Sequence, residues 1–262
     1  MKSYWQKVQL TTALRIALLG IITCYATIWM TPVSATPLKF SPPPPPPDRG
    51  AVGDRGGAAS RSCSVGNQSV IALVPVYEQT LKQGQTEVVT VNKVWGLTVS
   101  EHPTFWFFLP YNKSQINTIE FVLKDESIKP SQTLYRTTVK APEIPGIVSV
   151  GLPATTSPLQ AGKMYHWYFK MKGICDSQQP VQREYQEYVE GWVQRVNPNP
   201  RLANSLKQAT PQQRVGLYAE NGIWYDALTT LAELRLAKPQ DTTLATDWTN
   251  LLNSVGLEPF LK

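Results

Sequence analysis

The tripeptide Ser100-Glu101-His102 places a hydroxyl, a carboxylate and an imidazole side by side, the groups used in nucleophilic and general acid–base catalysis. Neighbouring residues on an extended chain point to opposite faces, and Pro103 favours extended geometry at His102. The three side chains therefore cannot form a catalytic triad among themselves. The same tripeptide is also typical of a bend with polar contacts.

A catalytic role for His102 would need a partner from a distant part of the chain, and we consider Asp125, Glu126 and His166 for it. If the protein is an enzyme, Glu101 and His102 are its candidate catalytic residues; otherwise they are candidates for binding on a loop. The sequence has no GxSxG, HExxH, phosphate-loop or EF-hand motif. Its two histidines cannot build a multi-histidine metal site. We therefore predict no metal site and no cofactor.

Tryptophans are the other residues with binding potential. Trp106 lies in a continuous apolar run and Trp167 on the apolar face of an alternating segment, so we expect both in the core. Trp95 and Trp192 each adjoin a glycine at less regular positions. An exposed indole there would stack on a sugar or on a partner's side chain, with packing in the core as the alternative.

These residues fall within a region of strand-like sequence. In "KMYHWYFKMK", the residues Tyr165, Trp167, Phe169 and Met171 share one face and polar residues share the other. About seven or eight such segments, separated by Pro, Gly and Asn turns, favour an antiparallel β-sandwich of immunoglobulin-like type. Tyr165 follows "PLQAGK", where sandwiches of this type place a tyrosine that bonds to the backbone just upstream.

The pattern becomes helical after residue 197. Thr210-Pro211 is a helix start, residues 223–238 have apolar positions at helical spacing, and Asp241 precedes another such segment that stops near Gly256. The fold class is therefore α+β: a β-sandwich over residues 63–197, then a bundle of about three helices over 198–262 packed on it.

The N-terminus has the features of a secretory signal. Basic residues precede the apolar run Ile16–Met30, and Val33-Ser34-Ala35 follows it, so we predict a signal peptide over residues 1–35. A retained anchor and lipid attachment at Cys24 are the alternatives. The signal carries three basic and no acidic residues, so its removal lowers the formal net charge from +6 to +3. We expect an exported protein, periplasmic or secreted, with no membrane span after cleavage.

The mature chain has no basic cluster interleaved with aromatic residues, which excludes nucleic acid as a partner. It begins with a Pro/Gly-rich segment, residues 36–62, that we predict to be a disordered linker. Cys63 and Cys175 are the two cysteines left after cleavage. In an oxidising compartment we predict a disulfide between them, with two buried thiols as the alternative.

Two resemblances extend this interpretation. The segment "YAENGIWYDALTTLAELRLAKP" resembles part of a tetratricopeptide repeat, but it supplies only about one and a half units, whereas such arrays need at least three. We therefore expect this hairpin to dock on the sandwich. The segments "GLTVSEHPTFWFFLPY", "PGIVSVGLP", "GKMYHWYF", "VEGWVQRV" and "GIWYDALTTLAELR" resemble a family of exported cyanobacterial proteins, domain of unknown function DUF928. That resemblance implies the compartment but no activity.

Three functions remain open on the sequence. The first is a non-catalytic exported module that binds a partner protein or a glycan of the cell envelope. The second is a hydrolase-type enzyme that acts on envelope material through His102 and an acidic partner. The third is a structural accessory of a surface or secretion assembly.

Overall fold

The computed structural model describes residues 37–44, 55, 69–83, 87–174 and 184–257, all within the unit Pro37–Lys262. The predicted signal peptide, most of the predicted linker, and both Cys63 and Cys175 lie outside the described residues. Most of residues 37–44 are exposed or half-buried, but Phe40 is 2% exposed and meets Trp224 edge to face, with ring centroids 5.0 Å apart. Phe40 therefore ties this segment to the core.

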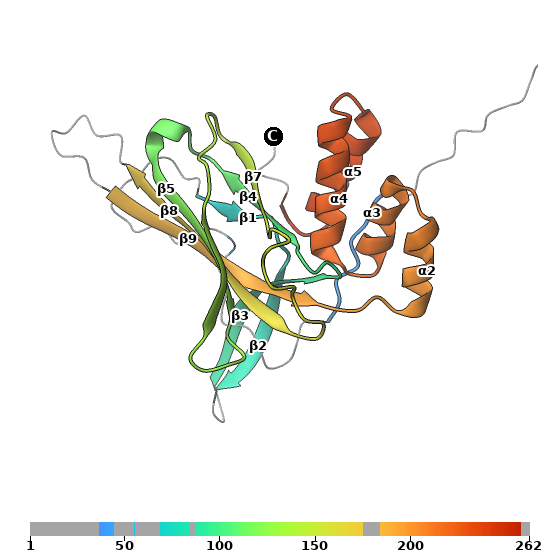
Figure 1. The fold of residues 1–262 in the computed structure, drawn as a ribbon, viewed down its shortest axis with the longest axis horizontal. Coiled ribbons are helices and arrows are strands. Elements are labelled where there is room, and N and C mark those ends of the chain that lie inside the picture. Colours follow the sequence, from blue (N-terminus) through green and yellow to red (C-terminus); the bar gives the residue numbers. More distant parts are fainter. Residues whose placement is uncertain (1–36, 45–54, 56–68, 84–86, 175–183, 258–262) are drawn as a thin grey trace, which may run out of the picture. The chain divides into compact units, whose positions relative to one another are not determined.

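The architecture is α+β, with two β-sheets followed by four helices (Figure 1). The sheets consist of β1 (Ile71–Ala72), β2 (Val76–Gln83), β3 (Glu87–Thr98), β4 (Thr104–Leu109), β5 (Ile116–Asp125), β6 (Gln132–Thr138), β7 (Gly146–Gly151), β8 (Met164–Ile174) and β9 (Glu184–Arg195), with a short 3₁₀ helix, η2 (Lys113–Gln115), before β5.

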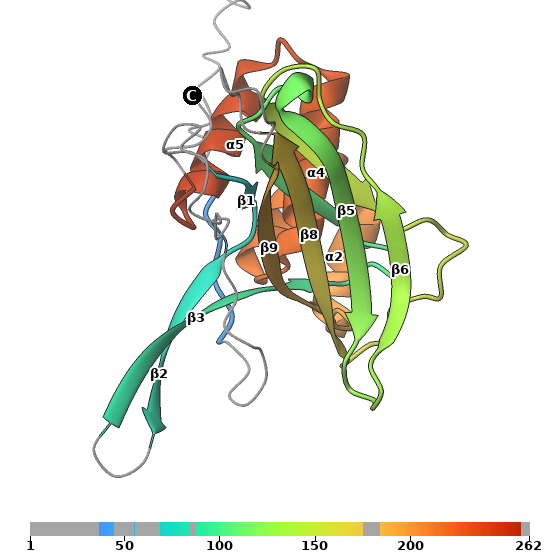
Figure 2. The same ribbon diagram turned by 90° about the vertical axis from the view of Figure 1, so that its left-hand side faces the viewer.

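One sheet has three strands in the order β1-β4-β7, and the other has six in the order β2-β3-β9-β8-β5-β6. Figure 2 shows β9, β8, β5 and β6 side by side in the larger sheet. The strand pairs are antiparallel except β3 with β9, which run parallel over Trp95–Thr98 and Trp192–Arg195. This parallel pair departs from the purely antiparallel arrangement that alternation predicted, because alternation shows which face is buried but not the direction of the neighbouring strand.

Aromatic side chains from both sheets form the core. Phe107 of β4 stacks on Phe169 of β8, with centroids 4.0 Å apart, and Phe105 of β4 contacts Phe121 of β5 at 4.8 Å. Trp167 is fully buried among them, so its predicted core position is confirmed, as is that of Trp106, which is 8% exposed. The apolar face of β8 is buried as its alternation predicted.

The tyrosine contact predicted at the entrance to β8 is present. The backbone N–H of Gln160 donates a 2.9 Å hydrogen bond to the hydroxyl oxygen of Tyr165. The ring of Tyr165 is 3% exposed, so the residue ties the preceding loop to the core.

The C-terminal residues up to Leu257 form four helices: α2 (Pro200–Gln208), α3 (Pro211–Glu220), α4 (Trp224–Ala237) and α5 (Thr242–Asn253). The sequence suggested about three, because "NPNPR" was interpreted as a strand break. In α2 the same residues start a helix: Asn199 accepts a bond from the N–H of Leu202, and Pro200 occupies the first turn, where no amide donor is needed. Thr210 and Asp241 cap α3 and α5 as expected.

Helix α4 packs against residues of both sheets and of the segment that follows β1. The indole N–H of Trp224 donates to the carbonyl of Leu73 at 2.8 Å, and that of Trp167 donates to the hydroxyl of Tyr225 at 2.9 Å. A Cβ on Gly96 would lie 3.0 Å from the Tyr225 ring, so the glycine lets helix and strand approach closely. Among the described helices, none is long and apolar enough to cross a membrane.

Candidate functional site

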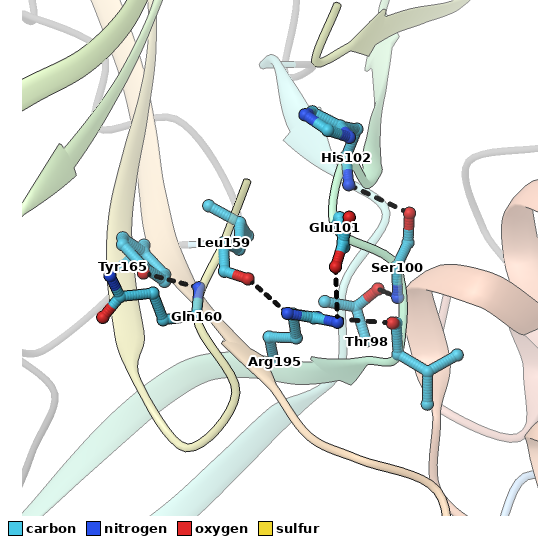
Figure 3. Close-up of polar contacts among 9 residues, drawn as sticks. Thr98, Ser100, Glu101, His102, Leu159, Gln160, Tyr165 and Arg195 are labelled. Carbon is cyan, nitrogen blue, oxygen red and sulfur yellow. Dashed lines mark hydrogen bonds and ion pairs between the residues drawn. The ribbon is translucent and has the colours of Figure 1, made fainter. Parts of the chain in front are cut away.

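Glu101 and His102 lie in the connection between β3 and β4, and their side chains do not converge (Figure 3). The Glu101 carboxylate forms a 3.0 Å ion pair with Arg195 at the end of β9. Arg195 also donates to the carbonyl of Leu159 at 2.7 Å. Because the Glu101 side chain is 55% exposed, its ion pair is screened by solvent, and the whole arrangement ties the loop to the sheet.

His102 is held by the backbone of another loop. The backbone N–H of His102 donates to the Ser100 hydroxyl oxygen at 3.1 Å. The ring Nε2 lies 2.9 Å from the carbonyl oxygen of Thr156. A carbonyl only accepts, so Nε2 carries a hydrogen and donates it to Thr156. The imidazole is therefore oriented, as a binding or catalytic histidine has to be.

The acidic partners considered for His102 take part in other contacts. Asp125 accepts from Lys163 at 3.1 Å, and Glu126 lies 3.2 Å from Nδ1 of His166. His166 is 3% exposed, and its Nε2 lies 3.4 Å from Glu190 on its other side. Burial lowers the pKa of His166, although Glu126 opposes this. These groups form a separate cluster on β5, β8 and β9.

An acid that the sequence did not single out joins His102 at a cleft. The cleft has a volume of about 210 Å³ and lies between the β3–β4 connection and α4. Its polar lining includes Ser100 and His102 from the connection, Thr98 and Thr104 from the strand ends beside it, and Asp226, Thr229, Thr230 and Glu233 from the helix. We refer to this space as the α4 cleft.

Asp226 is fixed within the first turn of α4. One carboxylate oxygen accepts from the Thr98 hydroxyl at 2.7 Å and from the N–H of Val99 at 3.1 Å. Desolvation raises the pKa of Asp226 to about 6, although these hydrogen bonds act in the opposite direction. A carboxyl that titrates this close to neutral pH is a feature of functional sites.

The sequence did carry a signal for Asp226. It stands directly after Trp224 and Tyr225, which are both buried, and an acidic residue that follows two buried aromatics at a helix start lies close to the core. The spacing in "GIWYDALTTLAELR" predicts only a packing helix, because helical spacing does not show which strand end the first turn meets.

The two tryptophans proposed as binding residues occupy aligned positions on neighbouring strands, β3 and β9. Trp95 is 3% exposed and packs edge to face on Tyr77, with ring centroids 5.6 Å apart. It therefore does not present the exposed ring that a stacking platform needs. Trp192 is half-buried and stacks on His166, with centroids 4.2 Å apart and an interplanar angle of 13°. One face of its indole is thus already occupied.

Comparisons with known proteins give a family but no activity. The model of the family described as "Domain of Unknown Function (DUF928)" matches residues 52–262. A solved structure of a protein called "pT26-6p" is 11% identical over 68% of this chain, with a TM-score of 0.29, which is too low to support an argument about fold. The match covers 35% of that protein's own chain. No curated protein matches the sequence.

Proposed function

This chain belongs to the DUF928 family, and we propose that it is a non-catalytic exported module that binds a glycan of the cell envelope in the α4 cleft. Export rests on the N-terminal sequence described above. The immunoglobulin-like character of the sandwich is part of the proposal, and the hydrogen bond between Tyr165 and Gln160 supports it.

The polar lining of the α4 cleft carries the proposal. Hydroxyl groups from both the loop and the helix surround a space that also holds two carboxylates. Sugar hydroxyls both donate and accept, so they complement a lining of this kind from several directions. The volume of about 210 Å³ is below the ~300–1,000 Å³ of pockets for drug-sized ligands, which fits one unit of a polymer rather than a long stretch of it.

Tryptophan fluorescence offers a direct test. The indole N–H of Trp106 donates to the hydroxyl of Thr229, which lines the cleft, so a bound ligand changes the surroundings of this indole. We expect a saturable change when the mature chain is titrated with at least one envelope polysaccharide fraction. If no fraction changes the emission, the glycan proposal is wrong.

A pair of variants localises the binding. Thr230→Val keeps the shape of the side chain but removes a hydroxyl that lines the cleft, so we expect binding weaker by about 2–10-fold. Thr246→Val makes the same change on the exposed face of α5 and should leave binding unchanged. Equal affinities of the two variants would place the ligand elsewhere.

One observation favours the hydrolase alternative. His102 and Asp226 line the same cleft, and the pKa of Asp226 is raised to about 6, a value suited to proton transfer near neutral pH. In this version the acidic partner of His102 is Asp226 rather than Glu101. Release of new reducing ends from a fraction by the wild type, with loss of that release in His102→Ala, would favour the enzyme over the binding module.

A further inference from the structure

We infer that the α4 cleft selects a glycan unit that carries a primary ammonium group, an amino sugar with a free amine. The inference rests on the proposed function and adds the chemical class of the ligand. It depends on the charge of the cleft and on the direction of its hydrogen bonds.

The charge of the cleft is negative. Asp226 and Glu233 both line it, and none of its lining residues is a lysine or an arginine. The two acids are seven residues apart on α4, two helical turns, so they lie on the same face roughly 10 Å apart along the axis. A cation that enters the cleft is therefore attracted to both carboxylates, whereas an acidic sugar is repelled.

Two of the donors that line the cleft are already used within the protein. The Thr98 hydroxyl donates its hydrogen to Asp226 and accepts from the N–H of Ser100, so it has no donor left for a ligand. The Nε2 hydrogen of His102 is directed to the carbonyl of Thr156 and is likewise not available to a ligand. An ammonium group brings three donors and no acceptor, so it can pair with the two carboxylates and with the hydroxyl oxygens of the lining.

The state of Asp226 agrees with a cationic ligand. Desolvation raises its pKa, and the groups that favour its charged form are neutral hydrogen-bond donors: the Thr98 hydroxyl and the backbone N–H groups of Val99, Ser100 and Asp226 itself. An ammonium ion beside it favours the charged carboxylate and returns the pKa toward its ordinary value. Ligand and carboxylate thus stabilise each other in a partly dehydrated space, where a charged hydrogen bond is stronger than one in bulk water.

A lysine side chain offers the same ammonium group, so the test includes both sources. Isothermal titration calorimetry on the mature chain at pH 6.5 would compare a glucosamine tetrasaccharide with free amines, its N-acetylated counterpart of the same backbone, and tetralysine. We expect the free-amine sugar to bind at least about tenfold more tightly than the acetylated sugar. A change of this size in the dissociation constant corresponds to one hydrogen bond to a charged group.

Two variants test the role of the carboxylates. Asp226→Asn keeps an oxygen that accepts from Thr98 and Val99, and Glu233→Gln changes an exposed residue, so both variants should fold. Each should lower the preference for the free-amine sugar several-fold. Glu143→Gln makes the same change of charge at an exposed residue outside the cleft lining and should leave the preference unchanged.

The outcomes separate this inference from the proposed function. If the two sugars bind equally, or if Asp226→Asn keeps the full preference, the ammonium inference is wrong and the glycan function stands. If only tetralysine binds, the ammonium chemistry stands and the partner is a peptide, so the glycan function is wrong. If none of the three binds, both are wrong.

Discussion

Replacement of Asp226 by asparagine should make the protein more stable at neutral pH. The pKa of this carboxyl is raised from 3.8 to about 6, and each pKa unit corresponds to about 1.4 kcal/mol. The ionised carboxylate therefore destabilises the fold by at most about 3 kcal/mol at pH 7. Because Asp226 is only half-buried and water in the cleft screens its charge, we expect a gain of about 1–3 kcal/mol for Asp226→Asn. Asparagine keeps the acceptor used by Thr98 and Val99.

The pH dependence follows from the direction of the shift. The folded state holds the Asp226 proton more tightly than the unfolded chain does, so it binds more protons between about pH 4 and pH 6. The destabilisation is therefore fully present above pH 6 and is relieved as the pH falls toward 4. The advantage of Asp226→Asn should be largest at pH 7 and should disappear near pH 4.

Urea unfolding followed by tryptophan fluorescence at pH 7 and pH 4 measures this difference. Asp125→Asn is a matched control with the opposite sign. Burial opposes the ionisation of Asp125, but hydrogen bonds from Ser127 and Lys163 outweigh it and lower its pKa, so removal of its charge should destabilise the protein at pH 7. An Asp226→Asn protein that is less stable than the wild type at pH 7, or equally changed at both pH values, would refute the reasoning.

Three further substitutions test local contacts by thermal or urea unfolding. Tyr165→Phe removes the acceptor for the N–H of Gln160 and should cost about 1 kcal/mol; an unchanged unfolding midpoint would show that water replaces the bond. Gly191→Ala places a methyl group against the buried Trp167 ring and should cost about 1–3 kcal/mol, and a neutral result would mean that the strand shifts freely. Thr210→Ala removes the α3 cap and should cost about 1 kcal/mol, unless the helix start is held by its neighbours alone.

Asp226 combines a stability cost with the binding role proposed for it. If both the unfolding and the calorimetry results hold, Asp226→Asn is a more stable protein that binds its ligand less well. That combination is typical of a functional residue, because active and binding sites often lower stability in exchange for function. The two experiments are independent, since one needs no ligand and the other compares ligands.

Local patterns in the sequence were sufficient for much of the fold. The alternation along β8 predicted which of its side chains are buried, because successive residues of a strand point to opposite faces whatever the strand pairs with. The starts of α3 and α5 were evident from Thr210-Pro211 and Asp241, since a cap acts on amides only two or three residues away. The predicted contact of Tyr165 is also local, five residues from Gln160.

The candidate site depends on contacts between distant parts of the chain, which no local pattern contains. Asp226 meets Thr98 across 128 residues, and Glu101 joins Arg195 across 94 because β3 and β9 run parallel. The sequence by itself therefore determined the class of most segments, though not of α2, and the buried face of β8, through interactions that span a few residues. Only the tertiary structure decided that Asp226, and not Glu101, shares a cleft with His102, because strand pairing and helix docking fix which segment ends meet.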